Sequence, residues 1–378
     1  MALPRPRRIW RIVGLIATFL ALFSLTFTSL VMADISSWTK KVDINKLLDK
    51  NPRPKDSYAN RDLNVLVIGS DHRSKPEKDE TGRLVTGMRS DTTLLAHISA
   101  DRKRVEVISI PRDLMVSRPT CTRENGTTVY GTRSDVQFNS IFALLGGDND
   151  VAAATACTLK TIEEFTGVYI DEFVVVDFDG FEQMVEALGG VNVCIDKPMR
   201  DIYGNVNLQP GCHELNPQQA LGFARARKGI EDGSDLSRIT RQQKLIGAMM
   251  KEAQSRNYLT DLPALYSFLR AAMRSMTTSP TFGQASNLGG LALSLGNTNT
   301  ANIHFYTLPI GAYPADPARV ALADEADEMF AALRDDKPIP SSFPYQDLNG
   351  NKIEPPAEGS QQCGNSCSVV ETPGNTNR

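Results

Sequence analysis

The chain has 378 residues, a formal net charge of −3 and a hydrophobic fraction of 41%. This length and apolar content fit one large domain with additions, and they allow a sizeable buried core. The nearly balanced charge shows no global basic excess, so composition argues against nucleic acid as a partner.

The first predicted element is an uncharged apolar segment over residues 12–33. About 20 apolar residues span a bilayer as a helix, and basic residues favour the cytoplasmic side. We therefore predict a single-pass plasma-membrane anchor, with residues 1–11 in the cytoplasm and the remainder extracytoplasmic. The alternative is a cleaved signal peptide, for which the segment is long. The basic residues that precede it are Arg5, Arg7, Arg8 and Arg11.

Residues 34–61 are polar and are predicted to form an extracytoplasmic stalk. Apolar, β-rich runs then alternate with helical patterns over residues 62–336, which predicts an α/β catalytic domain whose sheet is covered by helices. The tail over 337–378 is rich in Pro, Asn, Ser and Gly, and is predicted to lack a packed core. The predicted strands are Asn64–Gly69, Thr92–Ile98, Val105–Ile110, Phe173–Phe178, Val191–Ile195 and Ile303–Leu308. The predicted helices are Val151–Thr166, Phe181–Leu188, Pro217–Ala224, Ile239–Ser255, Leu262–Met276 and Asp324–Leu333.

The six cysteines fit an extracytoplasmic location, because an even count in an oxidising compartment predicts disulfides. The pairing is not fixed by the sequence, and free thiols remain the alternative. A zinc site is disfavoured, since there is no C-x-x-C pair and the chain has four histidines. The local pairs we favour are Cys121 with Cys157, Cys194 with Cys212, and Cys363 with Cys367.

Charged residues follow several predicted strands directly. Asp71 ends the first strand, and Arg112 with Asp113 ends a later one. Arg89 and Asp91 are two apart, so an extended segment presents both on one side. Ligands of open α/β sheets bind beyond the carboxyl ends of strands. Singly, these residues also fit a turn or a surface ion pair; together they predict a charged site at one sheet edge.

A second group of polar side chains comes from predicted helices. Arg225 and Arg227 diverge by about 200° on a helix, so they share a target only if the helix ends there. Gly229 shortly afterwards supports such a break. The next helix places three residues on one face at i, i+3 and i+4: Arg238, Arg241 and Gln242. The alternative for that face is simple solvation.

Two aspartates and up to six arginines thus gather near strand ends and helix starts. Guanidinium forks match phosphate oxygens, and magnesium is held by one or two carboxylates together with substrate phosphates. The combination predicts a pyrophosphate ligand with magnesium, or manganese as the alternative ion. No Walker-type phosphate loop is present.

The ordered motifs resemble the LytR-CpsA-Psr family, and the cysteine pattern is most similar to actinobacterial members. The family implies a central mixed β-sheet covered by helices on both sides. The resemblance covers roughly Leu63 to Asp335. It rests on G-S-D at 69–71, R-S-D-T at 89–92, S-I-P-R-D at 109–113, V-D-F-x-G-F-x-x-M-V-x-A-L-G-G-V at 176–191, A-R-A-R at 224–227 and S-R-I-T-R-Q-Q at 237–243.

The resemblance also implies site roles. Asp71 and Asp91 would coordinate magnesium and, with Arg89 and Arg112, form the catalytic set. Asp113 would be structural, orienting an arginine. The pyrophosphate would be gripped by Arg89, Arg112, Arg225, Arg227, Arg238, Arg241 and Gln242.

The function implied by the family is transfer of a glycan phosphate from a polyprenyl-pyrophosphate carrier to a peptidoglycan hydroxyl. The glycopolymers carried by family members include wall teichoic acid, capsule and arabinogalactan. The alternatives are a polyprenyl-pyrophosphate hydrolase and a non-catalytic polyprenyl-phosphate sensor. A membrane-bound transcription regulator is disfavoured, because residues 1–11 are too few for a DNA-binding domain.

Overall fold

The computed structural model describes residues 37–48, 58–71, 88–201, 206–226, 234–255, 270–296 and 298–355, with single positions 14, 15, 18, 19, 22, 26, 29, 34 and 268. Within this described part of the chain, no helix combines the length and apolarity needed to cross a bilayer. Most of the predicted anchor over residues 12–33 lies outside the described residues.

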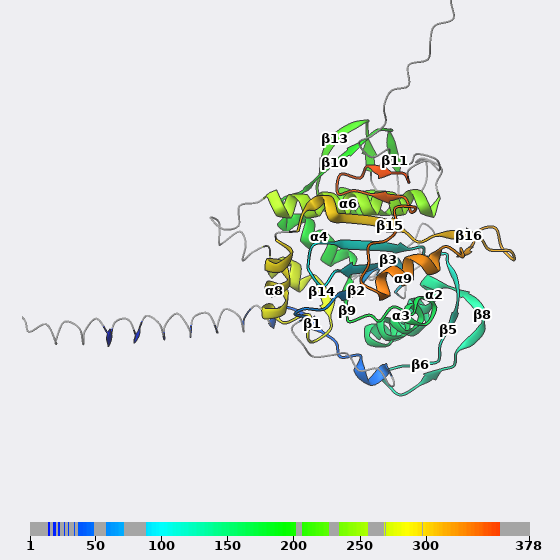
Figure 1. Cartoon of the computed structure of the whole chain (residues 1–378), viewed down its shortest axis with the longest axis horizontal. Coiled ribbons are helices and arrows are strands. Elements are labelled where there is room, and N and C mark those ends of the chain that lie inside the picture. The colour runs from blue at the N-terminus through cyan, green and yellow to red at the C-terminus, as the bar shows by residue number, and fades with distance from the viewer. Residues whose placement is uncertain are drawn as a thin grey trace, which may run out of the picture.

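A nine-stranded mixed sheet forms the centre of the molecule (Figure 1). The pairs β2–β9 and β4–β15 are parallel, whereas β2–β3 and β3–β4 are antiparallel. This arrangement confirms the predicted mixed sheet. In spatial order the strands are β1 (Lys40–Lys41), β14 (Met276–Thr278), β9 (Glu172–Val176), β2 (Leu63–Ser70), β3 (Ser90–Ile98), β4 (Val105–Ile110), β15 (Ile303–Thr307), β18 (Tyr345–Gln346) and β19 (Lys352–Ile353).

Helices cover both faces of the sheet, as expected. Successive side chains of a strand point to opposite faces, so Leu66 and Ile68 of β2 join one apolar cluster, whereas Leu63 and Val65 join another. Figure 1 shows α6 on one side of the sheet and the helices of the first cluster on the other. The first cluster contains α2 (Phe138–Leu145), α3 (Val151–Thr166) and α9 (Ala326–Arg334); the second includes residues of α6 (Asp235–Ser255) and α8 (Ala285–Leu295).

A smaller lobe with its own apolar cluster adjoins α6. Asn216 caps its helix α5 (Pro217–Arg225) in a reciprocal capping box with Gln219. Cys194 lies directly opposite Cys212 in the antiparallel pair β10–β13, and the two form a disulfide. The other elements are α4 (Phe178–Ala187), β10 (Val191–Ile195), β11 (Met199–Asp201), β12 (Val206–Leu208) and β13 (Gly211–Leu215).

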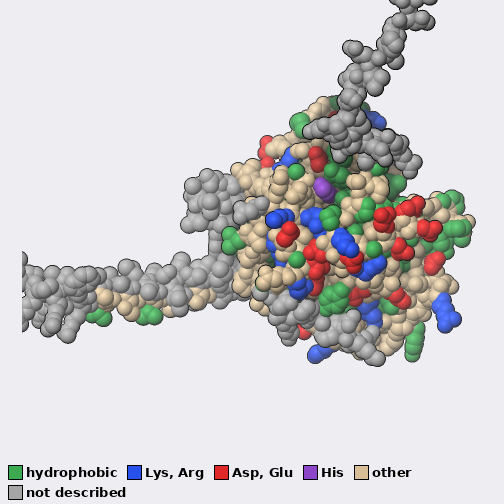
Figure 2. All heavy atoms as spheres, in the orientation of Figure 1, with side chains coloured by type: hydrophobic (Ala, Val, Ile, Leu, Met, Phe, Trp, Pro, Cys, Tyr) green, Lys and Arg blue, Asp and Glu red, His purple; other side chains and the backbone are tan. Residues whose placement is uncertain are grey.

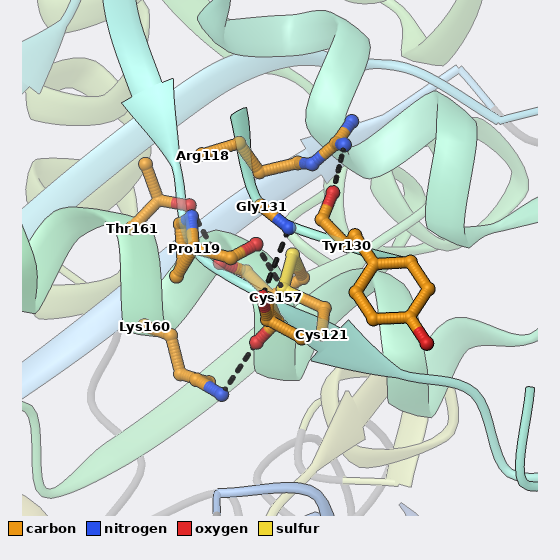
Figure 3. The surroundings of a disulfide bond; sticks show 9 residues. Arg118, Pro119, Cys121, Tyr130, Gly131, Cys157, Lys160 and Thr161 are labelled. Atoms are coloured by element: carbon orange, nitrogen blue, oxygen red, sulfur yellow. Dashed lines mark hydrogen bonds between the residues drawn. A yellow bond between two sulfur atoms is a disulfide. The ribbon is translucent and has the colours of Figure 1, made fainter. Parts of the chain in front are cut away.

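A second disulfide joins Cys121 to Cys157 of α3 (Figure 3). It fastens the hairpin strands that follow β4 to the helix layer. Beside it, Lys160 Nζ donates to the carbonyl of Thr120 at 2.8 Å. Both described pairings agree with the prediction, and Cys363 and Cys367 lie outside the described residues. The hairpin strands are β5 (Met115–Arg118), β6 (Cys121–Thr122), β7 (Thr128–Val129) and β8 (Thr132–Gln137).

The packed domain extends beyond the predicted boundaries at both ends. Part of the predicted stalk forms β1, and Tyr58 is buried. Within the predicted tail, β18 pairs with β15, and Leu348 packs against α6 so closely that a Cβ on Gly247 would lie 2.6 Å from its carbonyl oxygen. Residues 337–355 therefore belong to the domain. The predicted helix ending at Met276 also differs, because Met276 begins β14.

Candidate active site

Three strand ends meet at one edge of the central sheet. β3 runs antiparallel to both neighbours, with Ser90 opposite Ser70 of β2 and Thr93 opposite Ile110 of β4. The residues that follow β2 and β4 and those that begin β3 are therefore neighbours. These are the predicted site residues Asp71, Arg89, Asp91 and Arg112.

A β-bulge sits at this edge. Gly69 is opposite Thr92 and Ser70 is opposite Ser90, so Asp91 is the extra residue of β3. Bulges redirect side chains and are frequent beside functional sites. The bulge turns the side chain of Asp91 toward the end of the neighbouring strand β4, where Arg112 lies.

Asp71 makes two hydrogen bonds with the backbone of Arg89. The amide N–H of Asp71 donates to the carbonyl of Arg89 at 3.0 Å, and the amide of Arg89 donates to Asp71 Oδ1 at 2.6 Å. Burial raises the pKa of Asp71, the hydrogen bond from Arg89 lowers it, and the charge of Asp91 raises it further. Asp71 and Asp91 thus influence each other as neighbouring carboxylates.

A chain of ion pairs links β3, β4 and α6. Arg112 Nη1 lies 3.0 Å from Asp91 Oδ1, and Arg112 Nε lies 3.2 Å from Asp235 Oδ1. The same oxygen of Asp235 lies 2.5 Å from Arg238 Nη2, which also donates to the carbonyl of Asp91 at 3.1 Å. Sequence reasoning assigned Asp235 no role, although its position three residues before Arg238 was an available signal.

Several buried atoms of these ion-paired residues make no hydrogen bond of good geometry. Both carboxylate oxygens of Asp235 and the Nε atoms of Arg112 and Arg238 are buried without one. Burial raises the pKa of Asp235 and lowers that of Arg238, while their opposite charges act in the other direction. Buried polar atoms without such bonds call for an explanation, and a bound ligand is one. The two Nε–H groups are donors that an anion could accept from, whereas the two oxygens of Asp235 would need a donor or a cation.

Asp113 also contacts Arg112 and links it to two further side chains. Its Oδ2 lies 3.5 Å from Arg112 Nε, and its Oδ1 accepts from Arg319 Nη1 at 2.7 Å and from Gln137 Nε2 at 2.5 Å. These contacts are in keeping with the orienting role expected of Asp113. Neither Gln137 nor Arg319 was identified from the sequence, because each contact joins residues distant along the chain.

The predicted residues on α5 and α6 hold the junction between these helices. Arg241 Nη2 donates to the carbonyl of Ala226 at 2.5 Å, and Gln242 Nε2 donates to that of Ala224 at 3.2 Å. Arg225 stacks over the ring of Phe178 at 4.5 Å from its centroid, and its charge lowers the pKa of Asp71. Arg225 therefore lies within electrostatic reach of the sheet edge. Arg227 lies outside the described residues.

A cavity of about 320 Å³ opens beside Arg112. It is separate from α6 and lies against the start of α2. Its lining residues are Arg89, Arg112, Asp113, Gln137, Asn139, Ser140, Ala143 and Arg319.

The described surface carries charges of both signs. Figure 2 shows basic and acidic side chains interspersed across the face in view, in keeping with a net charge of −3.

Among the residues that the structure describes, no group of three or more His, Cys, Asp or Glu side chains could hold a metal by itself. A metal at Asp71 and Asp91 would need further ligands besides these two carboxylates.

The protein is thus an α/β protein with an arginine–aspartate cluster at the end of its central strands, and guanidinium groups of this kind can bind phosphate oxygens. The sequence matches the LytR_cpsA_psr family over residues 31–334, and the chain belongs to that family.

Two proteins of Corynebacterium glutamicum are similar in sequence. The chain is 28% identical over 279 residues to the probable cell wall biosynthesis protein LcpB, a match covering 72% of this chain and 61% of that protein. It is 26% identical over 262 residues to the cell wall biosynthesis protein LcpA, covering 65% and 49%. The chain thus spans about half to three-fifths of the length of these relatives.

A relative in Bacillus subtilis is the polyisoprenyl-teichoic acid–peptidoglycan teichoic acid transferase TagT, 29% identical over 266 residues, with coverage of 68% of this chain and 71% of TagT. The solved structure of TagT bound to LIIa-WTA has a TM-score of 0.56 at 22% identity, covering 78% of this chain and 98% of that one. The LytR-Csp2A-Psr enzyme from Actinomyces oris has a TM-score of 0.55 at 20% identity, covering 78% and 95%. These structures support the fold.

Proposed function

We propose that this protein is a phosphotransferase that attaches a cell-wall glycopolymer to peptidoglycan. The donor is a polyprenyl-pyrophosphate-linked glycan, and the acceptor is a peptidoglycan hydroxyl. Family membership supports the general role, since TagT is named for a polyisoprenyl-linked donor and a peptidoglycan acceptor. The observation that carries the proposal is the ion-pair chain Asp91–Arg112–Asp235–Arg238 at the sheet edge.

In this proposal the acceptor hydroxyl oxygen forms a bond to the phosphorus on the sugar side of the anhydride. The anhydride bond breaks, polyprenyl phosphate leaves, and the hydroxyl proton passes to a carboxylate of the site. The anhydride supplies the driving force, so the protein acts by positioning and charge neutralisation. Arg112 and Arg238 are the guanidinium groups that would neutralise charge on the equatorial and leaving oxygens.

The donor set at the edge fits magnesium, with manganese as the alternative. Asp71 and Asp91 supply hard carboxylate oxygens. Burial, and to a lesser extent the charge of Asp91, raises the pKa of Asp71, and the buried Oγ of Ser90, next to Asp91 in the chain, makes no hydrogen bond. Magnesium is commonly held by one or two carboxylates plus substrate phosphates. When bound, it would neutralise phosphate charge; Asp71 and Asp91 are the residues that would hold it.

The predicted anchor over residues 12–33 completes the proposal. It would hold the site on the outer side of the plasma membrane, where a lipid-linked donor and peptidoglycan are both within reach. The location therefore rests on the sequence pattern.

Transfer and hydrolysis can be separated with labelled water. The full-length chain in detergent would receive a polyprenyl-pyrophosphate disaccharide, magnesium and peptidoglycan oligomers in H₂¹⁸O. A transferase yields a glycan phosphate joined to the oligomer without ¹⁸O. Free sugar phosphate carrying ¹⁸O, with no joined product, would make the protein a hydrolase. Saturable lipid binding with neither product would make it a sensor.

A further inference from the structure

The outer face of α8 is open to solvent and carries no charged side chain. Leu288 and Leu291 pack on the apolar cluster that α8 shares with α6. Leu293, in contrast, is 81% exposed, and a Cβ on Gly289 or Gly290 would meet no atom within 4 Å. A single exposed leucine is ordinary, but a surface helix usually turns charged or polar side chains to water. The composition of this face therefore favours an apolar partner.

The start of α8 lies close to the end of the predicted anchor. Thr39 Oγ1 donates to the carbonyl of Gly283 at 3.2 Å, just before α8 begins, and a Cβ on Gly283 would lie 3.1 Å from Lys41 Cε. Only residues 34–38 separate Thr39 from the predicted anchor, and Asp34 is their one charged member. Even fully extended, this link reaches roughly 20 Å. Thr39, and the start of α8 beside it, therefore stay within about that distance of the bilayer.

Basic side chains border this face on the side of the anchor. Lys40 and Lys41 of β1 are exposed, and Figure 1 shows β1 and α8 on the same side of the molecule. The guanidinium group of Arg270 lies 5.6 Å from the ring centre of Trp38, just ahead of β1. The nearest carboxylate along the chain, Asp43, accepts hydrogen bonds from the residue two positions later. Apolar helix faces bordered by basic residues bind anionic membrane surfaces.

We propose that the outer face of α8 docks on the anionic surface of the bilayer that holds the predicted anchor. Leu293 enters the interfacial layer, and the lysines of β1 face the lipid headgroups. The inference rests on the proposed function, of which the anchor is a part. A single anchor lets the domain pivot about its link, whereas a second contact fixes its orientation. Because α8 and α6 share one apolar cluster, docking would also orient Arg238 and the sheet edge toward lipid-linked donors.

Leu293→Trp reports contact of this face with lipid. The full-length chain is placed in nanodiscs that hold one chain each, made of phosphatidylglycerol with or without bromine on its acyl chains. Bromine quenches tryptophans that reach the acyl region, and the wild type corrects for the native Trp10 and Trp38. Tyr130→Trp is the matched control, because Tyr130 is 79% exposed and precedes β8, on the other side of the molecule from α8 (Figure 1).

Brominated lipid is expected to quench Leu293→Trp beyond the wild-type level and to leave Tyr130→Trp at that level. No added quenching at position 293, or equal quenching at both positions, would overturn the docking surface. Discs of brominated phosphatidylcholine carry no net negative charge, so quenching at position 293 should be weaker in them. Equal quenching in the two lipids would overturn the assignment to an anionic surface.

Fluorescence quenching requires no turnover, so its outcome is independent of the phosphotransferase proposal. Quenching at position 293 without any transfer would leave the surface standing and contradict the enzyme. A full-length chain that does not copurify with the discs would overturn the anchor and the surface together. Self-association in detergent that Leu293→Glu abolishes, with no quenching in the discs, would assign the face to a second copy of the chain and overturn the proposal.

The orienting role has its own readout. Leu293→Glu should match the wild type in transfer from a donor dissolved in detergent, because Leu293 lies outside the candidate active site. The same variant should lose transfer from a donor embedded in the disc. Wild-type rates of Leu293→Glu in the discs would overturn the orienting role of α8.

Discussion

Arg112 Nη1 and Asp91 Oδ1 lie 3.0 Å apart across the edge of the central sheet. The two residues come from different strands, and their contact depends on the bulge in β3 and on the antiparallel register of β3 with β4. Arg112 is also within reach of Asp113 and Asp235. Because three carboxylates surround it, its orientation is fixed before any ligand arrives.

Replacement of Arg112 by Ala should lower turnover by about 100-fold or more, by analogy with loss of one preorganised donor to a transition state. Steady-state transfer rates measure the effect. Arg118→Ala is the control, because Arg118 donates to the carbonyl of Tyr130 beside the disulfide region (Figure 3). Equal activity of Arg112→Ala and Arg118→Ala would remove Arg112 from the catalytic set.

Asp235→Asn should have different effects on the stability of the free protein and on its stabilisation by a bound anion. The carboxylate lies between Arg112 and Arg238, so its loss leaves two neighbouring cations without their shared anion. Because burial raises the pKa of Asp235, replacing its carboxylate by a neutral amide also removes a desolvation cost at neutral pH, so we expect little change in the free energy of unfolding. Added inorganic pyrophosphate should raise the stability of Asp235→Asn more than that of the wild type, measured as a shift in Tm. An identical shift in both proteins would show that Asp235 does not hold the anion-binding arginines.

The raised pKa of Asp71 predicts that its contribution to the free energy of unfolding depends on pH. The folded state binds the proton more tightly than the unfolded state, so this contribution to stability is present below the ordinary pKa of 3.8 and is lost as the pH rises through the raised value. Asp71→Asn should therefore gain stability relative to wild type as the pH rises toward neutrality, while activity is lost. Denaturant unfolding from about pH 2 to 8, on both sides of the ordinary pKa, measures the difference.

Asp101→Asn provides a control of opposite sign. The hydroxyl of Ser99 donates to Asp101 and lowers the pKa of its carboxyl. The stabilising effect of Asp101 is present above its ordinary pKa of 3.8 and is lost as the pH falls through the lowered value, so Asp101→Asn should lose stability relative to wild type as the pH rises toward 3.8 and show a flat profile above it. Parallel pH profiles for Asp71→Asn and Asp101→Asn would mean that burial does not dominate at Asp71.

The two disulfides should contribute different amounts of stability. A cross-link typically adds about 2–4 kcal/mol by restricting the unfolded chain. Cys121–Cys157 spans 36 residues and Cys194–Cys212 spans 18, and doubling a loop adds only about 0.6 kcal/mol. Paired Cys→Ser variants should thus both be destabilised, the longer loop slightly more. Stability unchanged by the double replacement at 121 and 157 would contradict this expectation.

Local signals predicted several elements well. The helix Val151–Thr166 was predicted at its observed bounds, because Asp150 caps its start and Gly167 ends it with a left-handed residue. The helix α4 begins three residues earlier than predicted, since Asp177 accepts a hydrogen bond from Gly180 and caps it there. Among the described helices, α2 and α8 were missed, because they carry no charged residues to mark a solvent-facing side.

Site residues could be predicted from the sequence where a local pattern marks them. Asp71 and Asp91 stand at strand ends, which the sequence shows directly. Asp113 meets Arg319 across 206 positions and Gln137 across 24, and no local pattern reports such contacts. The tail boundary was wrong for a related reason: Ile339, Phe343 and Leu348 are isolated apolar residues in a polar segment, and only the fold reveals that they are buried.

The most direct test is a transfer assay on the full-length chain with a polyprenyl-pyrophosphate glycan, magnesium and peptidoglycan oligomers. Mass spectrometry would compare the wild type, the wild type with EDTA, and Asp91→Asn. The predicted result is a glycan phosphate joined to the oligomer in the wild type alone. A joined product that persists at wild-type levels in Asp91→Asn would contradict a catalytic role for the sheet edge built around Asp91 and Arg112.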